Sequence, residues 1–374
     1  VHTGGTTGPS KGVVLSNFSV NAASFQCENA GYDFKREHNW LNIMPPFIAY
    51  GIGNGLHLPL SCGMEVILIP QFDPNKFDDL LLENRPNHMV GVPSHYGNII
   101  HSKKLENEDL SYIIAPTVGG DKMDENLEKK TNEFLSKHHC DYKVVKGYGM
   151  TEVNAAVAAC TSNETNKIGS VGIPFPNTTI SIFDPDTGEE LGYNEKGEVC
   201  ITGPNTMIGY FNNEEETNKI LRKHEDGNVW VHSGDIGYMD ADGNLFIVDR
   251  LKRMIIRPDG FKIFPSLIED VVVKHPLVKS CKTVGLRDLK FSQGKLPKAH
   301  VVLYETDRNI KDIENEIYML CEEQLPEYYW PCEIEFNKSL PLTAIGKVDY
   351  LKLEDEDEKK QLAVTKKLKI MSKR

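Results

Sequence analysis

Short apolar runs recur along the first part of the chain, and polar segments of helix length separate several of them. The runs cover residues 42–46, 65–70, 88–92, 113–118 and 142–146, and the polar segments include residues 73–84 and 124–138. Neighbouring parallel strands need a long crossover between them, which is usually a helix. This rhythm therefore predicts an α/β fold built on a parallel sheet.

The pattern of apolar and polar segments changes after residue 165. Short apolar runs and turn signals, such as residues 184–188 and 240–243, follow one another up to residue 250 and predict a β-rich subdomain. A smaller α/β unit is expected beyond it. Its predicted helices lie near residues 266–274 and 310–324, and its predicted strands near residues 283–286 and 299–304.

We therefore expect a multi-domain protein of the α/β and α+β type, which a length of 374 residues allows. The large domain covers residues 1–250, with an α/β part at 1–165 and a β-rich part at 166–250. The small domain covers residues 251–350. Residues 351–374 run from acidic to basic and are expected to form a tail, either a solvated helix or a frayed terminus.

The charge and composition of the chain limit its partners. A net charge of −12 argues against a nucleic-acid partner, because phosphate backbones require a clustered basic surface. No apolar run approaches the ~20 residues that a membrane span requires. Small anionic ligands remain possible, since local lysines and loop amides decide their binding.

The eight cysteines are scattered along the chain without a C-x-x-C pair. This pattern favours free thiols in a reducing compartment over a disulfide framework or a zinc site. We therefore expect a cytoplasmic protein.

A glycine-rich segment stands at the beginning of the chain, where residues 3–12 read Thr-Gly-Gly-Thr-Thr-Gly-Pro-Ser-Lys-Gly. Glycine leaves backbone N–H groups uncovered, hydroxyls donate to oxygen anions, and Lys11 supplies a compact positive charge. The segment can thus bind phosphate, or it can be a flexible surface loop. It is not the G-x-x-x-x-G-K-S/T phosphate loop, because Lys11 follows Ser10.

A second constellation covers residues 147–152, which read Gly-Tyr-Gly-Met-Thr-Glu and follow a candidate for a buried strand. Tyr148 can stack on a base, which is worth roughly 1–3 kcal/mol in comparable contacts. Thr151 can donate to a phosphate, and Glu152 offers an oxygen ligand for magnesium. The alternative is a turn followed by a capped helix.

A third constellation contains His232-Ser233-Gly234-Asp235 and, further on, Asp249-Arg250. An aspartate such as Asp235 can accept hydrogen bonds from both ribose hydroxyls, and an arginine such as Arg250 can donate to them or to phosphate. The alternative is that Asp235 is only a hairpin-turn residue.

The last constellation is residues 341–349, which read Pro-Leu-Thr-Ala-Ile-Gly-Lys-Val-Asp. By itself, Lys347 has the features of an ordinary solvated lysine near a terminus. Only in combination with the other three segments does Lys347 become a candidate for a functional role.

Taken together and in this order, the four segments resemble the signatures of the adenylate-forming, or AMP-binding, enzyme superfamily. This superfamily includes acyl- and aryl-CoA synthetases, peptide-synthetase adenylation domains and luciferases. Residues 147–152 match its G-Y-G-M-T-E signature without a mismatch. Gly4 and Ser10 stand where the family usually has serine and proline in T-S-G-T-T-G-x-P-K-G, and Tyr350 stands where arginine commonly follows P-x-T-x-x-G-K-x-D.

The resemblance implies a role for each matching residue. The loop would hold the β- and γ-phosphates of ATP, Thr151 and Lys347 the α-phosphate, and Glu152 the magnesium ion. Tyr148 would flank the adenine, and Asp235 and Arg250 would contact the ribose or phosphate. The remaining implied nucleotide contacts are Thr3, Gly4, Gly5, Thr6, Thr7, Gly8 and Lys11 in the loop, and Gly120 and Asp121 beside the adenine.

The resemblance also implies a mobile small domain that turns about Lys252 and brings Gly260 to the tunnel for the thiol. The acid pocket would lie near Phe47, Ile48, Tyr50 and Gly147. Amino-acid-activating relatives place an aspartate in the first of these segments. Residues 41–60 contain none, so an aliphatic or aryl acid is favoured over an amino acid.

The implied function is the ATP-dependent activation of a small carboxylic acid to an acyl-adenylate, followed by thioester formation with coenzyme A. Two alternatives stay open, namely a nucleotide-binding fragment without turnover and an amino-acid adenylation domain that loads a carrier-protein thiol. The glycine-rich loop begins at the third residue, after Val1-His2. Since the family has substantial sequence before this loop, we expect the N-terminal part to be missing from the chain.

Overall fold

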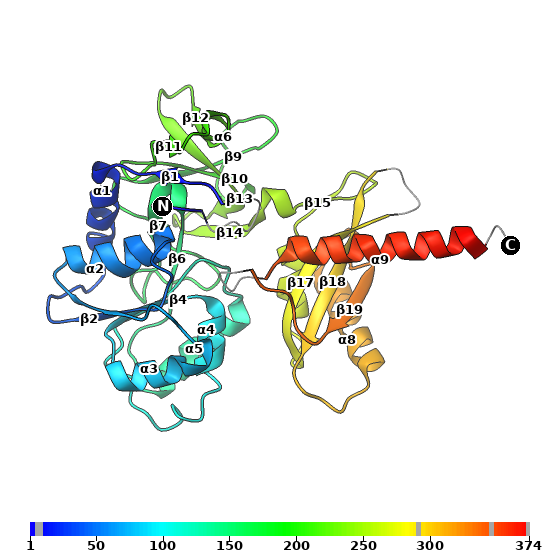
Figure 1. Ribbon diagram of the computed structural model, residues 1–374, viewed down its shortest axis with the longest axis horizontal. Coiled ribbons are helices and arrows are strands. Elements are labelled where there is room, and N and C mark those ends of the chain that lie inside the picture. Colours follow the sequence, from blue (N-terminus) through cyan, green and yellow to red (C-terminus); the bar gives the residue numbers. More distant parts are fainter. Residues whose placement is uncertain (4–9, 289–292, 344–347, 372–374) are drawn as a thin grey trace. The chain divides into compact units, whose positions relative to one another are not determined.

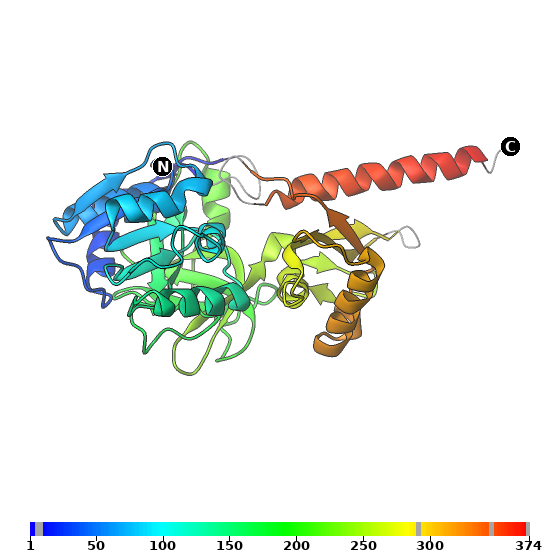
Figure 2. The same ribbon diagram turned by 90° about the horizontal axis from the view of Figure 1, so that it is seen from below.

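The computed structural model describes residues 1–3, 10–288, 293–343 and 348–371. The chain divides into two compact units, Val1–Ile247 and Val248–Arg374 (Figures 1 and 2). Each unit is described by itself below.

The first unit is built on a seven-stranded sheet with the strand order β3-β2-β4-β5-β6-β7-β8. Strands β3 to β6 run parallel, whereas β7 and β8 are antiparallel to their neighbours. The bounds are Asn39–Asn42 for β2, Glu65–Leu68 for β3, His88–Gly91 for β4, Ala115–Val118 for β5, Val145–Met150 for β6, Ala155–Ala159 for β7 and Ile173–Pro174 for β8. The predicted parallel α/β sheet is thus confirmed.

Helices cover both faces of this sheet, on opposite sides of the strands in Figure 1. One set is α1 (Asn17–Glu28), the π-helix η1 (Tyr50–His57) and α2 (Leu58–Ser61). The other is α3 (Phe77–Asn84), α4 (Pro93–Ile99) and α5 (Glu125–Lys137), with the 3-10 turn η2 (Pro74–Lys76) before α3. Helix α1 begins after Ser16, whose side chain caps it by accepting a hydrogen bond from the Ser19 N–H.

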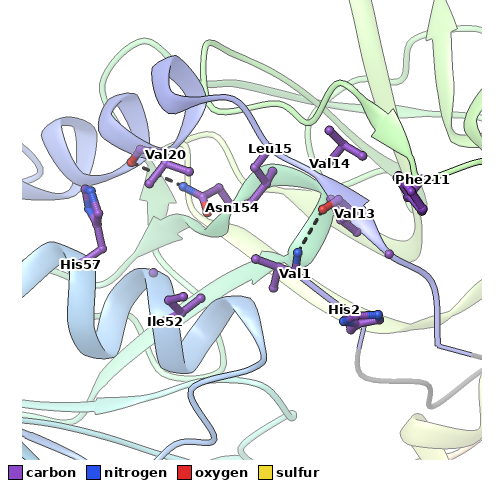
Figure 3. A pocket seen from close by; sticks show the side chains of 12 residues that line it. Val1, His2, Val13, Val14, Leu15, Val20, Ile52, His57, Asn154 and Phe211 are labelled. Carbon is purple, nitrogen blue, oxygen red and sulfur yellow. Dashed lines mark hydrogen bonds between the residues drawn. The ribbon is translucent and has the colours of Figure 1, made fainter.

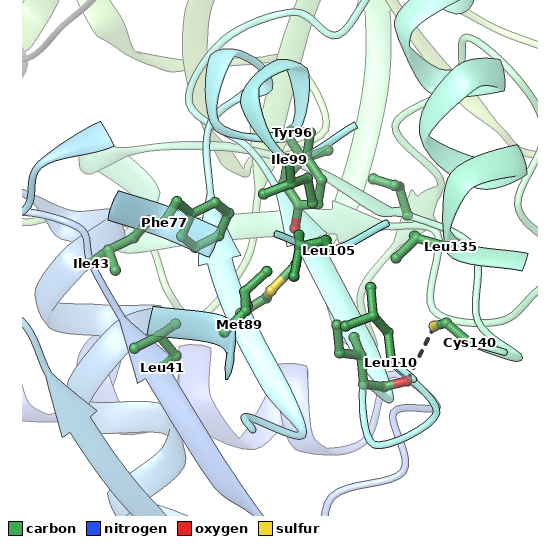
Figure 4. Packing of buried hydrophobic residues seen from close by; sticks show 14 of the residues in the cluster. Leu41, Ile43, Phe77, Met89, Tyr96, Ile99, Leu105, Leu110, Leu135 and Cys140 are labelled. Carbon is green, nitrogen blue, oxygen red and sulfur yellow. Dashed lines mark hydrogen bonds between the residues drawn. The ribbon is translucent and has the colours of Figure 1, made fainter. Parts of the chain in front are cut away.

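Alternating strand residues divide the core of this unit into two layers. Leu41 and Met89 pack with Phe77 of α3 in the cluster drawn in Figure 4. Their neighbours Trp40 and Val90 pack in a second cluster on the other face of the sheet. The period of two residues in a strand explains this division.

One predicted strand lies earlier in the sequence than expected. Strand β2 covers Asn39–Asn42, whereas the apolar run suggested residues 42–46. That run contains Pro45-Pro46, which cannot donate to a ladder. The polar ends of β2 find partners instead: Asn39 and Asn87 exchange backbone-to-side-chain hydrogen bonds, and the buried Asn42 side chain donates to the Gly51 carbonyl at 3.0 Å.

The β-rich part of the first unit is a five-stranded sheet, which agrees with the short apolar runs and turn signals in this part of the sequence. Its order is β12-β13-β10-β9, with β14 paired to β13. A two-stranded ladder of β1 and β11 lies beside the short helix α6. The bounds are Val13–Val14 for β1, Thr179–Phe183 for β9, Gly197–Thr202 for β10, Gly209–Tyr210 for β11, Glu214–Ile220 for α6, Leu221–Lys223 for β12, Val229–Met239 for β13 and Leu245–Arg250 for β14.

The second unit is a smaller α/β structure around a three-stranded sheet with the order β17-β18-β19. Helices α7 and α8 pack on it through Ile268, Ile313 and Ile317. The bounds are Leu251–Arg253 for η4, Ile255–Ile256 for β15, Lys262–Ile263 for β16, Pro265–Val272 for α7, Val278–Arg287 for β17, Lys295–Leu303 for β18, Ile310–Gln324 for α8, Glu327–Tyr329 for η5, Glu333–Asn337 for β19 and Tyr350–Met371 for α9.

The expected solvated tail is a long helix whose first turns are docked on the second unit. Tyr350 and Leu353 of α9 pack against Val284, and the Asp357 side chain is buried. Figure 2 shows that the C-terminal part of α9 extends beyond the sheet that its first turns cover. A charge-rich sequence hid this docking, because only every third or fourth residue of the helix faces the sheet.

All eight cysteines lie in the described part of the chain and are free thiols. Within the described residues, no helix combines the length and the apolar character that a membrane crossing needs.

Candidate functional site

The base of the glycine-rich loop is closed by hydrogen bonds between its two ends. The Thr3 N–H donates to the Lys11 carbonyl at 2.9 Å, and the Lys11 N–H donates to the Thr3 hydroxyl at 2.9 Å. The Ser10 hydroxyl donates to the Thr3 carbonyl at 2.7 Å. The predicted phosphate contacts Gly4, Gly5, Thr6, Thr7 and Gly8 lie outside the described residues.

Lys11 lies against two residues that are about 200 positions away in the sequence. Its ammonium forms an ion pair with Glu216 of α6, and it lies 4.7 Å from the centre of the Tyr210 ring. The Tyr210 hydroxyl in turn donates to Glu152 Oε1 at 2.6 Å. The loop lysine and the candidate magnesium ligand therefore both contact one tyrosine.

Burial and charge shape this cluster. Glu152 is 6% exposed and Tyr210 is 8% exposed. Burial and the adjacent Glu152 carboxylate raise the pKa of Tyr210 well above its ordinary value. The phenol consequently stays protonated and acts as a donor to Glu152 over the whole physiological range.

The segment 147–152 folds as a hairpin rather than as a strand followed by a capped helix. Strand β6 continues through Gly147-Tyr148-Gly149-Met150, the single turn η3 (Thr151–Val153) follows, and β7 returns antiparallel. A Cβ on Gly149 would lie only 1.6 Å from the Ala155 carbonyl oxygen, so glycine is required there. Ala155 itself has a φ of +83°, which is a strained value for a residue with a side chain.

Tyr148 and Asp235, which come from different sheets, are joined by a hydrogen bond. The Tyr148 hydroxyl donates to Asp235 Oδ2 at 2.7 Å, and both side chains are more than nine-tenths buried. The structure thus brings together the residue predicted to flank adenine and the residue predicted to hold the ribose.

The segment predicted to lie beside the adenine follows β5. The Gly119 N–H donates to the Gly91 carbonyl at 3.1 Å, which continues the parallel ladder by one residue. Gly120 then adopts a φ of +76°, a conformation that favours glycine, and Asp121 is exposed. The segment therefore turns away from the sheet at its carboxyl edge, where α/β proteins bind ligands.

Three of the acid-pocket candidates gather at the same edge. The Tyr50 hydroxyl donates to the Gly91 carbonyl at 3.2 Å, and a Cβ on Gly119 would lie 3.4 Å from the Tyr50 ring and 3.7 Å from the Gly147 carbonyl oxygen. Burial raises the pKa of Tyr50. Ile48 packs in the same core cluster as Tyr50, whereas Phe47 is 62% exposed.

An apolar pocket of about 540 Å³ opens nearby between β1, α1 and η1. Figure 3 shows Val14, Leu15, Val20 and Ile52 around it, with His57 at one side. The four acid-pocket candidates are not among its lining residues. The sequence did not predict this pocket.

The remaining predicted residues belong to the second unit. Arg250 ends β14, and its N–H donates to the Asp249 carboxylate at 2.7 Å. Lys252 lies exposed in η4. Gly260 has a φ of +87° in the turn between β15 and β16. Lys347 lies outside the described residues, although Leu342 and Val348 form a β-bridge that closes the base of its segment.

Comparison with known families identifies the chain. Residues 1–211 match the profile described as AMP-binding enzyme, and residues 267–347 match its C-terminal domain. The chain belongs to the AMP-binding enzyme family. Its mixed α/β fold, with a large and a small part, agrees with the fold of solved adenylate-forming enzymes.

Among curated relatives of this AMP-binding enzyme, the long-chain-fatty-acid–CoA ligase of Bacillus subtilis is 33% identical over 357 residues, which are 95% of this chain and 61% of the relative. The probable 4-coumarate–CoA ligase 1 of Dictyostelium discoideum is 33% identical over 354 residues, which are 94% of this chain and 62% of the relative. The chain thus spans about three fifths of the length of these relatives.

Solved structures give the same family. The ATP-bound MatB of Rhodopseudomonas palustris superposes with a TM-score of 0.84 at 25% identity, covering 95% of this chain and 67% of that one. The AMP complex of the O-succinylbenzoate–CoA synthetase of Bacillus subtilis superposes with a TM-score of 0.78 at 27% identity, covering 95% of this chain and 68% of that one.

Sequence reasoning missed several residues that surround the candidate site. Neither Tyr210 nor Glu216 is among the site residues predicted from the sequence. A buried group of Glu198, Cys200 and His232 also has ligand atoms within 4.8 Å of one another.

Proposed function

We propose that this AMP-binding enzyme activates a carboxylic acid with ATP and then transfers the acyl group to a thiol, with coenzyme A as the acceptor. The observation that carries the proposal is the convergence of Lys11 and Glu152 on Tyr210. A cation from a glycine-rich loop and a carboxylate that suits magnesium both contact one tyrosine. Such a pair is what binding of a magnesium-bound polyphosphate requires.

The reaction has two steps. A carboxylate oxygen of the acid attacks the α-phosphorus of ATP, the bond from that phosphorus to the bridging oxygen breaks, and pyrophosphate leaves. The thiolate sulfur of coenzyme A then attacks the acyl carbonyl carbon, and AMP leaves with the electron pair of the broken C–O bond. Neither step needs a nucleophile from the protein, so catalysis rests on positioning and charge stabilisation.

The proposal assigns a nucleotide contact to each predicted residue. Tyr148 would stack on the adenine beside the backbone of Gly120 and Asp121, and Asp235 would accept hydrogen bonds from the ribose hydroxyls. These four residues lie in the first unit, as does the Thr3–Lys11 loop proposed for the β- and γ-phosphates. Arg250 would add a donor to the ribose, and Thr151 and Lys347 would stabilise the α-phosphate.

Glu152 is the residue that would hold magnesium. Carboxylate oxygens are the hard ligands that magnesium prefers, and the Tyr210 hydroxyl fixes the orientation of this carboxylate through Oε1. Bound magnesium would draw charge away from the phosphates. The protein would keep Glu152 buried and aligned for this role, and the hydrogen bond from Tyr210 aligns it.

The proposed acid pocket would lie at the carboxyl edge of the sheet, where Tyr50 and Gly147 both lie close to Gly119. Ile48 packs in the same core cluster as Tyr50. Two relatives are named for a long-chain fatty acid and for 4-coumarate. An aliphatic or aryl acid suits these walls.

The free thiols of all eight cysteines are in keeping with a cytoplasmic location.

The test is pyrophosphate release by the purified chain with ATP, magnesium, coenzyme A and a panel of aliphatic and aryl acids. Lys347→Ala should lower the rate by roughly 10²–10³, judging from the loss of one oxyanion donor. Lys352→Ala, an exposed lysine at the start of α9, is the matched control and should leave the rate unchanged.

Two other outcomes would redirect the proposal. ATP binding by calorimetry without an acyl-adenylate in the mass spectrum would favour a nucleotide-binding protein without turnover. Acyl-adenylate formation followed by transfer to a carrier-protein thiol, and not to coenzyme A, would contradict the proposed acceptor.

A further inference from the structure

Strand β13, which carries Asp235, departs from its regular ladder with β10 at residues 233–235. Strands β10 and β13 pair Glu198 with Ile236 and Cys200 with His232, so a single residue of β10, Val199, faces three residues of β13. Those three are Ser233, Gly234 and Asp235. An extra stretch of this kind is a β-bulge, and bulges commonly redirect a side chain next to a functional site.

The carboxylate of Glu198 holds this bulge. Its Oε1 accepts a hydrogen bond from the Gly234 N–H at 3.0 Å. Gly234 has a φ of +70°, a conformation that leaves its N–H outside the regular ladder. The Ser233 hydroxyl adds a bond to the Val199 carbonyl at 2.6 Å, and the Asp235 N–H donates to the Ser233 hydroxyl at 3.0 Å.

A buried histidine fixes Glu198 in turn. His232 Nδ1 lies 2.8 Å from Glu198 Oε2, and His232 Nε2 lies 2.9 Å from Nε2 of the half-buried His224. Glu198 is 6% exposed and His232 is 8% exposed. Although burial raises the pKa of Glu198, the hydrogen bonds from His232 and Gly234 keep it below its ordinary value. The carboxylate is therefore charged and has both oxygens engaged.

We propose that Glu198, oriented by His232, is a positioning residue that holds the Ser233–Asp235 bulge so that the Asp235 carboxylate meets the ribose hydroxyls of the nucleotide. The inference rests on the proposed function, because it assumes that the chain binds ATP. Glu198 itself does not touch the nucleotide in this arrangement. Its effect passes through the Gly234 backbone to Asp235. The Oδ2 atom of Asp235 also accepts a hydrogen bond from the Tyr148 hydroxyl at 2.7 Å.

The proposal predicts a coupling between Glu198 and the ribose hydroxyls. Hydrogen bonds to a charged group contribute about 1.5–3 kcal/mol, so the wild type should bind ATP roughly 10–100 times more tightly than 2′,3′-dideoxy-ATP. In Glu198→Ala this preference should shrink to about threefold or less, while affinity for the dideoxy analogue stays within about twofold. A merely structural role would weaken both nucleotides equally.

Calorimetric titration of the full chain with ATP and with 2′,3′-dideoxy-ATP measures this coupling. Asp235→Ala is the reference that should lose the preference directly. Glu198→Gln should keep most of it, because its amide oxygen still accepts from Gly234. The matched control is Glu195→Ala, which removes another carboxylate that accepts from a glycine N–H, that of Gly192 at 2.7 Å in an exposed turn.

If Glu198→Ala does not fold, Glu198→Asp takes its place, since it keeps the charge but draws the carboxylate back by one methylene from Gly234. It should lose the preference as well. A wild type that discriminates together with Glu198→Ala and Glu198→Asp variants that discriminate equally would overturn this inference alone. A wild type that binds neither nucleotide, or binds both equally, would overturn the ribose role of Asp235 and this inference with it.

Discussion

The Tyr210 hydroxyl donates to the buried Glu152 carboxylate at 2.6 Å, and the two residues are 58 positions apart in the sequence. The tyrosine comes from β11 and the glutamate from η3, so the hydrogen bond joins the short β1–β11 ladder to the hairpin of β6 and β7. The candidate magnesium ligand is therefore held by an element that none of the four sequence signatures contains.

Tyr210→Phe should remove this donor and leave the ring in place beside Lys11. Because Glu152 then loses the bond that orients its carboxylate, the magnesium concentration for half-maximal pyrophosphate release should rise about three- to tenfold. Tyr193→Phe is the control, since Tyr193 is 64% exposed. An unchanged magnesium dependence in Tyr210→Phe would argue against Glu152 as the magnesium ligand.

Glu216→Gln should strengthen ATP binding by about two- to fivefold. The ion pair with Lys11, followed by that with Lys219, lowers the pKa of Glu216 to about 2, so this carboxylate is charged at every working pH. It competes with phosphate for Lys11, and this partly exposed pair itself contributes little to stability. The comparison is Glu215→Gln, whose carboxylate contacts Lys219 at 2.8 Å. Weaker ATP binding in Glu216→Gln would show that Lys11 needs this partner.

The sequence was sufficient for the fold class and for the four segments of the candidate site, because each segment is a local pattern. Residues 147–152 could be recognised by their letters alone. The contacts among segments could not: Lys11 and Glu216 are 205 positions apart, and no periodicity connects them. The hairpin at Ala155 was also hidden, since an alanine with positive φ contradicts the ordinary preference of that residue.

Polar residues also hid two parts of the fold from prediction, namely strand β2 and the docking of α9. Strand β2 carries Asn39 and Asn42, which a search for apolar runs passes over, although partners elsewhere in the fold hydrogen-bond to both side chains. In α9 a single buried acidic residue, Asp357, faces the sheet from a helix that otherwise has the composition of a solvated tail. Buried polar pairs of this kind depend on tertiary contacts that one sequence does not display.

Tyr50→Ala should widen the range of acids accepted by the enzyme. The Tyr50 ring fills the space against Gly119, and removing it opens a cavity at the edge of the sheet. Activity should move toward longer or bulkier acids, while stability should fall by less than the ~3–5 kcal/mol of a fully buried aromatic, because Tyr50 is only partly buried. Tyr50→Phe keeps the ring and should retain the wild-type preference. If Tyr50→Ala accepts the same acids as the wild type, Tyr50 does not line the acid pocket.

The docking of α9 depends on a buried charge network that should fail in acid. Asp357 Oδ1 accepts from Lys298 at 2.9 Å and Oδ2 pairs with His300 at 2.8 Å, and all three side chains are less than 5% exposed. Burial raises the pKa of Asp357, but the hydrogen bonds from His300 and Lys298 outweigh it and hold the pKa below its ordinary 3.8.

A carboxyl whose pKa is lower in the folded state stabilises the fold above its unfolded pKa, and that stabilisation disappears as the pH falls through the folded value. Asp357→Asn should therefore destabilise the second unit by about 1–3 kcal/mol at pH 7 and by much less near pH 3. Urea unfolding by circular dichroism gives the size of the loss, and hydrogen exchange in β17 and α9 gives its place.

The control for this prediction is Asp355→Asn, two residues earlier on the same helix. Asp355 is 56% exposed and pairs with Lys359 one turn away, so its removal should change stability by less than about 0.5 kcal/mol at either pH. Equal losses in Asp355→Asn and Asp357→Asn would mean that only the net charge of α9 matters. A loss in Asp357→Asn that persists at pH 3 would show that the network acts through packing and not through the ionised carboxylate.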